Sequence, residues 1–230
     1  LDFNREAKVV VGLFGKERSP KVLIEMGAAI GHGSLIEVAH LTEIPEQTDP
    51  GDIVETPRAL QSLRRRVIAM ATEQKIAINF DPIVSYDITK TIFQIGQRLH
   101  CEWILIEWAG KNRGGLTSHN PIGWSKNHLD CNLGIFRDAG IRYIRKILAV
   151  LSGSNQDFHV LVTAEHLGLV NNAEIVLAKY LPHTATDEEV EKAIEEIRFF
   201  SRAYFVPKEI LIFRGKDRLA TILDATIGYD

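Results

Sequence analysis

The sequence predicts an α/β protein with two parallel-sheet domains in tandem, chiefly because one order of segments occurs twice. An apolar run that ends in glycine at residues 8–15 is repeated at residues 146–153. In each copy a helical stretch, a second apolar strand, a charged helix and a third strand follow, and a short helix then opens on Asp87 or Asp217. A repeat of this length indicates duplicated domains rather than short solenoid units.

The first copy alternates strands with helices. We expect its strands at residues 8–13, 34–41, 76–84, 103–108 and 131–136. Val9–Val11 and Trp103–Ile106 are continuous apolar runs, which are typical of parallel strands covered on both faces. A helix over residues 20–30 has Ser19 as its expected N-cap and Pro20 at its first position. This alternation predicts a doubly wound sheet with its ligand site beyond the carboxyl ends of the strands.

The second copy is shorter than the first. We expect its strands at residues 145–151, 173–180 and 208–213. Thr186 and Glu189 form a predicted capping box at the start of a helix over residues 187–202. The copy reaches residue 230 where a fourth strand is expected, so the second domain is predicted to lack its last strands. The domain boundaries that follow are 1–138 and 139–230.

The composition is that of an ordinary soluble globular protein. Hydrophobic residues make up 45% of the 230 residues and charged residues 25%, and the formal net charge is −3. Nucleic-acid binding needs a basic surface, so no nucleic-acid partner is expected. Cys101 and Cys131 each stand at the start of an apolar stretch, which favours buried thiols over a disulfide framework. Metal-ligand spacings and a nucleophile–base triad are both missing from the sequence pattern, which therefore predicts neither a metal site nor an enzyme.

Three segments carry a resemblance to a known fold family: Val38–Thr48, Trp103–Gly110 and Cys131–Asp138. Together with the duplicated α/β order, they make the chain resemble the universal stress proteins. The detail is most similar to the tandem stress-protein region at the cytosolic C-terminus of some prokaryotic transporters of the amino-acid–polyamine–organocation superfamily. These transporters include amino-acid permeases and cation-chloride cotransporters. The resemblance implies two universal-stress-protein-like parallel α/β sandwich domains in tandem, the second incomplete.

The resemblance also implies where a nucleotide would bind. Family members that bind ATP carry an aspartate at the end of the first strand and a Gly-x2-Gly-x9-Gly-Ser/Thr signature after the fourth. The glycines let backbone N–H groups approach the phosphates. Here Phe14 and Ser152 stand at the aspartate position of the two copies, and Arg113 and Trp124 interrupt the signature counted from Gly110. The candidate residues of a degenerate adenine-nucleotide loop are Gly110, Gly114, Gly123 and Ser125. The alternative is a loop that only turns, with no cofactor bound.

These features favour a non-catalytic regulatory and dimerisation domain of an amino-acid or cation-chloride transporter, on the cytoplasmic face of the cell membrane. Its expected partners are the transmembrane domain of the same polypeptide and a second copy of itself. The fifth strand commonly forms the dimer edge in universal stress proteins, which implies a homodimer edge at Cys131, Leu133 and Ile135. This edge could instead be covered by the chain's own linker. The alternative function is a free-standing tandem universal stress protein that binds an adenine nucleotide.

Overall fold

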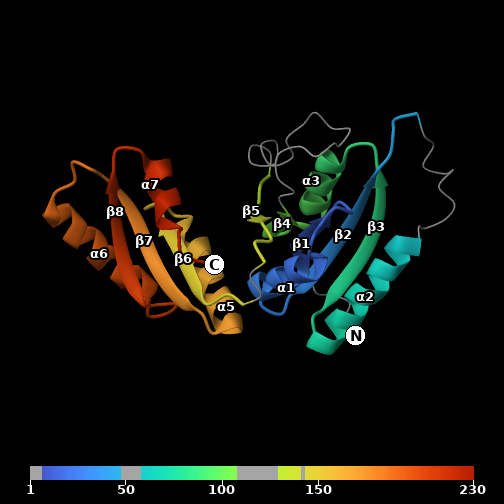
Figure 1. Ribbon diagram of the computed structural model, residues 1–230, viewed down its shortest axis with the longest axis horizontal. Helices are drawn as coiled ribbons and strands as arrows, with labels where there is room; N and C mark the ends of the chain where they lie inside the picture. The colour runs from blue at the N-terminus through green and yellow to red at the C-terminus, as the bar shows by residue number, and fades with distance from the viewer. Residues whose placement is uncertain (1–6, 48–57, 108–128, 141–142) are drawn as a thin grey trace. The chain divides into compact units, whose positions relative to one another are not determined.

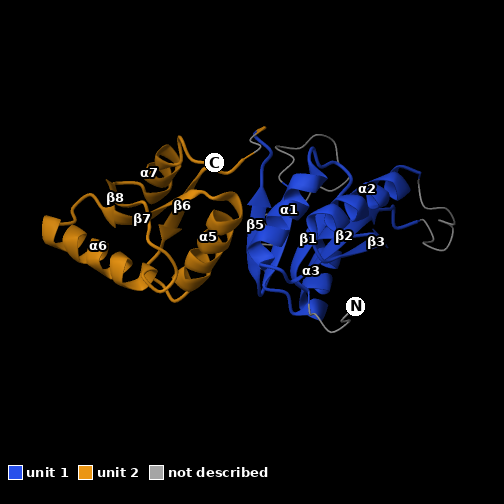
Figure 2. Cartoon of the chain, turned by 90° about the horizontal axis from the view of Figure 1, so that it is seen from below, with its two compact units in different colours: residues 1–139 blue, residues 140–230 orange. Residues whose placement is uncertain are grey.

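The computed structural model describes residues 7–47, 58–107, 129–140 and 143–230. The chain divides into two compact units, residues 1–139 and 140–230 (Figure 2). Each unit contains its own sheet of parallel strands with helices packed on it (Figure 1), so the predicted α/β fold with parallel sheets is confirmed. Of the helices in the described ranges, none has the length and apolar character required to cross a membrane.

The first unit is built on a five-stranded sheet. Its elements are β1 (Ala7–Leu13), α1 (Pro20–Gly31), β2 (Leu35–Glu43), α2 (Arg58–Gln74), β3 (Ile78–Ser85), α3 (Ile88–Leu99), β4 (Trp103–Glu107) and β5 (Asn132–Phe136). The strands are all parallel, in the order β3-β2-β1-β4-β5. The chain runs outward from β1 to β3 and then crosses back to β4 on the other side of β1. Ligands of doubly wound sheets bind in the crevice that is expected at such a reversal, here beyond the carboxyl ends of β1 and β4.

Successive side chains of each central strand enter opposite layers of the core. On one face, Val11 of β1 packs in a cluster with Leu23 of α1 and Met70 of α2. On the other face, Val10 packs in a cluster with Ile92 of α3. The continuous apolar runs in the sequence therefore reflect strands that are buried on both sides (Figure 1).

Local capping signals explain the starts of three helices. The Asp87 side chain accepts a hydrogen bond from the backbone N–H of Lys90 at 3.0 Å, and Asp217 caps α7 (Arg218–Ala225) in the same way. The predicted capping box at Thr186 is present. The start of α1 differs from the prediction, because the Ser19 side chain makes no cap hydrogen bond and its hydroxyl donates to Asp138 Oδ2 at 2.6 Å.

The second unit is built on a three-stranded sheet. Its elements are β6 (Lys146–Leu151), α5 (Asp157–Asn171), β7 (Glu174–Pro182), α6 (Asp187–Ser201), β8 (Glu209–Gly215) and α7 (Arg218–Ala225). The strands are parallel in the order β6-β7-β8. Leu161 of α5 and Ile197 of α6 pack in one cluster with Leu177 of β7. The Asp230 N–H donates to the carbonyl of Lys146 in β6 at 3.0 Å. In the first unit the N–H of Glu102, just before β4, donates in the same way to the carbonyl of Lys8 in β1.

Candidate functional site

The crevice beyond β1 and β4 is the candidate ligand site of the first unit, since the strand order reverses there. β1 continues into Phe14 and then into Gly15, whose φ of +77° lies in the left-handed region. α1 begins a few residues later at Pro20. The backbone N–H groups between β1 and α1 are the type of donor that binds phosphate in other α/β proteins.

Carboxylates of the chain itself accept hydrogen bonds from these N–H groups. The Phe14 N–H donates to Glu17 Oε1. The Arg18 N–H lies 3.3 and 3.2 Å from the two carboxylate oxygens of Glu107, the last residue of β4, and the Ser19 N–H also bonds this carboxylate. The Glu107 carboxylate therefore connects the end of β4 to the start of α1. In a nucleotide-binding protein these backbone N–H groups would be free to bind phosphate.

Negative charge is concentrated at this point. Burial raises the pKa of Glu107, and the nearby carboxylates of Glu17 and Asp138 act in the same direction, while the hydrogen bonds from Arg18 and Ser19 oppose the change. A phosphate entering the crevice would meet like charge and would have to displace the Glu107 carboxylate. The described part of the crevice is thus a poor site for polyanions.

Glu107→Gln is expected to flatten the pH dependence of stability. Because the pKa of Glu107 is raised in the folded protein above the ordinary 4.5, the folded state binds the proton more tightly than the unfolded state. The free energy of unfolding of the wild type, relative to the variant, should therefore increase as the pH falls from 7 towards 4.5, and level off below. Urea denaturation at several pH values measures this difference. Glu102→Gln is the control, at an exposed glutamate paired with Lys8; a difference independent of pH at position 107 would contradict the argument.

The two units share one further feature at the carboxyl ends of their first strands. In the first unit Gly15 lies against His40 of β2, and in the second unit Gly153, with φ +81°, lies against Lys179 of β7. His40 pairs with the last residue of β1, and Lys179 with the last residue of β6, so the two positions are equivalent. His40 is buried and its pKa is lowered by that burial, and its Nδ1 has no hydrogen-bond partner within the described residues.

The predicted site residues fall into two groups. The nucleotide-loop candidates Gly110, Gly114, Gly123 and Ser125 lie outside the described residues. The predicted dimer-edge residues are described: Cys131, just before β5, and Leu133 pack against the cluster that contains Ile92 of α3, and Ile135 is 46% exposed. The β5 strand is an edge of its sheet, with β4 as its one partner among the residues that the structure describes.

The carboxylate caps were not predicted from the sequence. The Glu107 cap of α1 joins residues 89 positions apart, so no local spacing reveals it. Its only sequence signal is a glutamate at the end of an otherwise apolar strand. Ser152 also has a role that the sequence did not suggest, since its N–H and hydroxyl both donate to Asp157 Oδ1 at 2.8 Å. Within the described ranges no group of three or more histidine, cysteine or acidic residues could hold a metal ion.

Comparison with known proteins identifies the fold. No protein-family model matches the chain, and no curated protein matches its sequence. A putative universal stress protein from Pseudomonas aeruginosa has a TM-score of 0.67 at 15% identity, over 97% of this chain and 80% of that one. A universal stress protein from Archaeoglobus fulgidus gives 0.61 at 15% identity, over 95% and 83%. The cytoplasmic domain of a prokaryotic cation chloride cotransporter gives 0.61 at 12% identity, over 93% and 80%. The fold is therefore universal-stress-protein-like.

Proposed function

We propose that this chain is a non-catalytic regulatory and dimerisation region on the cytoplasmic face of a membrane secondary transporter of the amino-acid or cation-chloride type. Its partners in this proposal are the transmembrane domain of the same polypeptide and a second copy of the region. The fold is compatible with this role, because the cytoplasmic domain of a cation chloride cotransporter has the same fold over most of this chain's length.

The observation that carries the proposal is that the chain's own carboxylates bind the backbone N–H groups at the crevice of the first unit. The Glu107 carboxylate binds the N–H groups at the start of α1, and Glu17 binds the N–H of Phe14. A stress protein that worked by binding ATP would need such donors for phosphate and would gain nothing from three carboxylates around them. These internal hydrogen bonds instead fix the turn after β1 and join the start of α1 to the end of β4, which suits a regulatory region that does not bind nucleotide there.

Cell fractionation tests the proposal directly. An antibody against this region is expected to detect a band much heavier than 25.8 kDa in the membrane fraction of the native cell. Washing the membranes with carbonate and high salt should leave the band in place, because a transmembrane domain is not released by either treatment. A soluble band near 25.8 kDa would contradict the proposal and favour a free-standing stress protein.

Nucleotide titration separates the two functions in the purified protein. Calorimetric titration with ATP and AMP is expected to show no saturable binding at millimolar concentrations. Lys208→Met, in the second unit, serves as a control for non-specific binding of nucleotide to surface lysines. Saturable binding with a stoichiometry of one would favour the adenine-nucleotide alternative and would point to the loop that contains Gly110 and Gly123.

A further inference from the structure

The second unit contains an open cavity at the carboxyl ends of β6 and β7. It has a volume of about 380 Å³ and lies between α5, α6 and the loop that follows β6. This volume is in the range of small-molecule sites. The lining residues that define its chemistry are Gly153, Phe158, Lys179, Glu196, Phe200 and Tyr204.

The cavity contains one positive and one negative side chain that face each other. Lys179 Nζ lies 3.4 Å from Glu196 Oε2, and the Lys179 side chain is only 20% exposed. A pair at this distance is weaker than a close charge-assisted hydrogen bond. The left-handed turn at Gly153 brings the backbone against the lysine, since a Cβ there would lie 3.7 Å from Nζ. The two charges are therefore held on the wall of the cavity, each able to accept a ligand group of opposite sign.

The remaining polar groups disfavour a phosphate ligand. The N–H groups of Ser152 and Gly153 both donate to the Asp157 carboxylate at 2.8 Å, so these two donors in the loop before α5 are already used. Asp157 and Glu196 together outnumber the single ammonium of Lys179. A polyanion would meet excess negative charge, and a simple cation would meet Lys179. A ligand that carries both charges matches the pair.

Aromatic rings form the apolar part of the cavity. The Phe158 ring packs edge-on against Tyr204, with centroids 6.1 Å apart. Phe158 and Phe200 nevertheless remain 50% and 62% exposed. Large apolar side chains that line a cavity and stay this exposed indicate a surface that binds an apolar group.

We propose that this cavity binds a free α-amino acid with an aromatic or large apolar side chain. The ligand carboxylate pairs with Lys179, its ammonium group pairs with Glu196, and its side chain packs against Phe158 and Phe200. The first unit has the buried imidazole of His40 in place of Lys179, so its described residues lack an ammonium group at the equivalent position. The assignment depends only on this cavity and holds whether or not the chain is attached to a transporter.

Three small probes test the charge requirement on the full chain. Calorimetric titration is expected to show saturable binding of L-phenylalanine. Phenethylamine, which lacks the carboxylate, and 3-phenylpropionate, which lacks the amine, should each bind at least about tenfold more weakly, because each loses one charge-assisted contact. Equal affinities for the three probes, or no saturable binding of L-phenylalanine, would overturn the proposal.

Matched variants test the residues. Lys179→Met and Glu196→Gln are each expected to weaken L-phenylalanine binding at least about tenfold. The control variants are Lys208→Met and Glu174→Gln, which break an ion pair of similar length, 3.3 Å, outside the cavity. If the control variants lost as much affinity for L-phenylalanine as the cavity variants do, the assignment would be overturned.

Two further variants, at Phe200 and at its neighbour Phe199, test the aromatic part of the cavity. Both side chains are so exposed that their truncation should not affect folding. Phe200→Ala should weaken L-phenylalanine binding several-fold, because the ligand ring loses apolar contact. Phe199→Ala removes the neighbouring ring, which is 72% exposed and does not line the cavity, and should leave binding unchanged. Equal effects at the two positions would show that the cavity is not the binding site.

Discussion

Mild oxidation is expected to join Cys101 and Cys131 in a disulfide within one chain. Because the bond closes a loop between residues 30 positions apart, it should raise the free energy of unfolding by about 3–4 kcal/mol through the lower entropy of the unfolded chain. The two Sγ atoms lie 3.8 Å apart. Cys101 precedes β4 and Cys131 precedes β5, and the N–H of Asn132 donates to the carbonyl of Glu102 at 2.9 Å. Neighbouring backbone segments therefore hold the two thiols together, so little movement is needed to form the bond.

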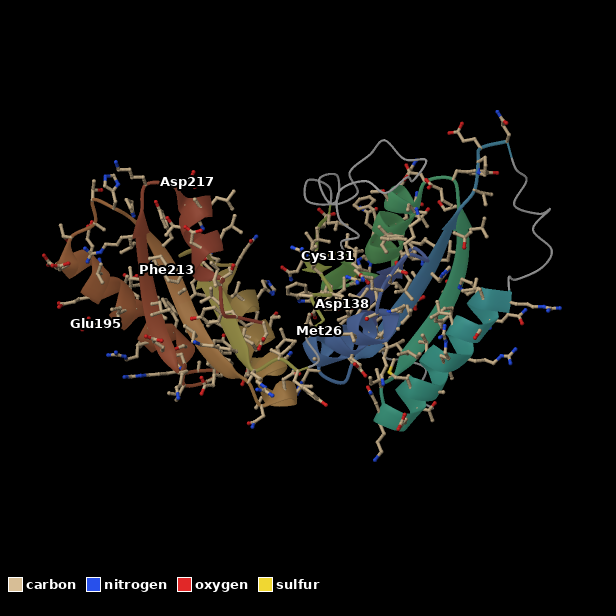
Figure 3. The ribbon with its side chains drawn as sticks, viewed as in Figure 1. Met26, Cys131, Asp138, Glu195, Phe213 and Asp217 are labelled. Atoms are coloured by element: carbon tan, nitrogen blue, oxygen red, sulfur yellow. The ribbon has the colours of Figure 1, made fainter. Side chains whose placement is uncertain are left out.

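The two thiols have different chemistry. A hydrogen bond from Cys101 lowers the pKa of Cys131, while the same interaction and burial raise the pKa of Cys101. Cys131 (Figure 3) is thus the expected nucleophile. Both cysteines line an adjacent cavity of about 330 Å³, through which an oxidant can reach Cys131. With diamide as oxidant, the Cys131 thiolate adds to the azo bond. Cys101 then displaces the hydrazine product, which carries away two electrons and two protons.

Intact mass and urea denaturation measure the outcome. The oxidised chain should lose the mass of two hydrogens, remain a single chain without reductant, and return to its starting stability after treatment with dithiothreitol. Cys101→Ser and Cys131→Ser are the controls, and neither should gain stability from diamide. Two thiols that stay open to alkylation after diamide treatment, or a disulfide that links two chains, would contradict the predicted pairing.

Much of the fold could be predicted because its signals are local. The apolar runs that became β1 and β4 are continuous since helices cover both faces of the sheet. Asp87 and Asp217 cap their helices as their positions before apolar helical segments indicated. Each of these features is determined by a few residues that are adjacent in the sequence, so the sequence alone is enough to predict it.

The side-chain contacts of the two candidate sites could not be predicted because they join residues that are distant in sequence. Ser19 has the expected residue type for an N-cap, but its hydroxyl bonds Asp138 from beyond β5 instead. Lys179 and Glu196 come from different elements and meet only once α6 packs on β7. The equivalence of His40 and Lys179 is also hidden in the sequence, since the residue types differ and only the strand register aligns them.

The two edges of the first sheet differ in a way that favours pairing through β5. At the β3 edge, the carbonyls of Ala77 and Ser85 accept from β2, so the backbone at Pro82, in the alternate register, points away from the sheet. A proline there removes an outward N–H and protects the edge from pairing. At the β5 edge, the N–H of Asn132 faces β4, which directs the backbone of Ile135 outward with its N–H intact.

Ile135→Pro is therefore expected to weaken homodimerisation at least about tenfold while leaving the sheet intact. Proline at an outward-facing position costs no hydrogen bond to β4, but it deletes a donor that an antiparallel partner needs, and two-fold symmetry doubles each loss. Sedimentation equilibrium measures the dimer constant, and urea denaturation checks the fold.

Val84→Pro is the matched control for the dimer, because it places proline at an outward-facing position of the other edge, beside the natural Pro82. It should leave the dimer constant unchanged. A wild type that stays monomeric at high concentration would exclude the dimer, and an Ile135→Pro variant as dimeric as wild type would place the interface elsewhere. If both proline variants weakened the dimer equally, the effect would come from general loss of stability. Only a loss confined to position 135 identifies β5 as the edge through which two copies pair.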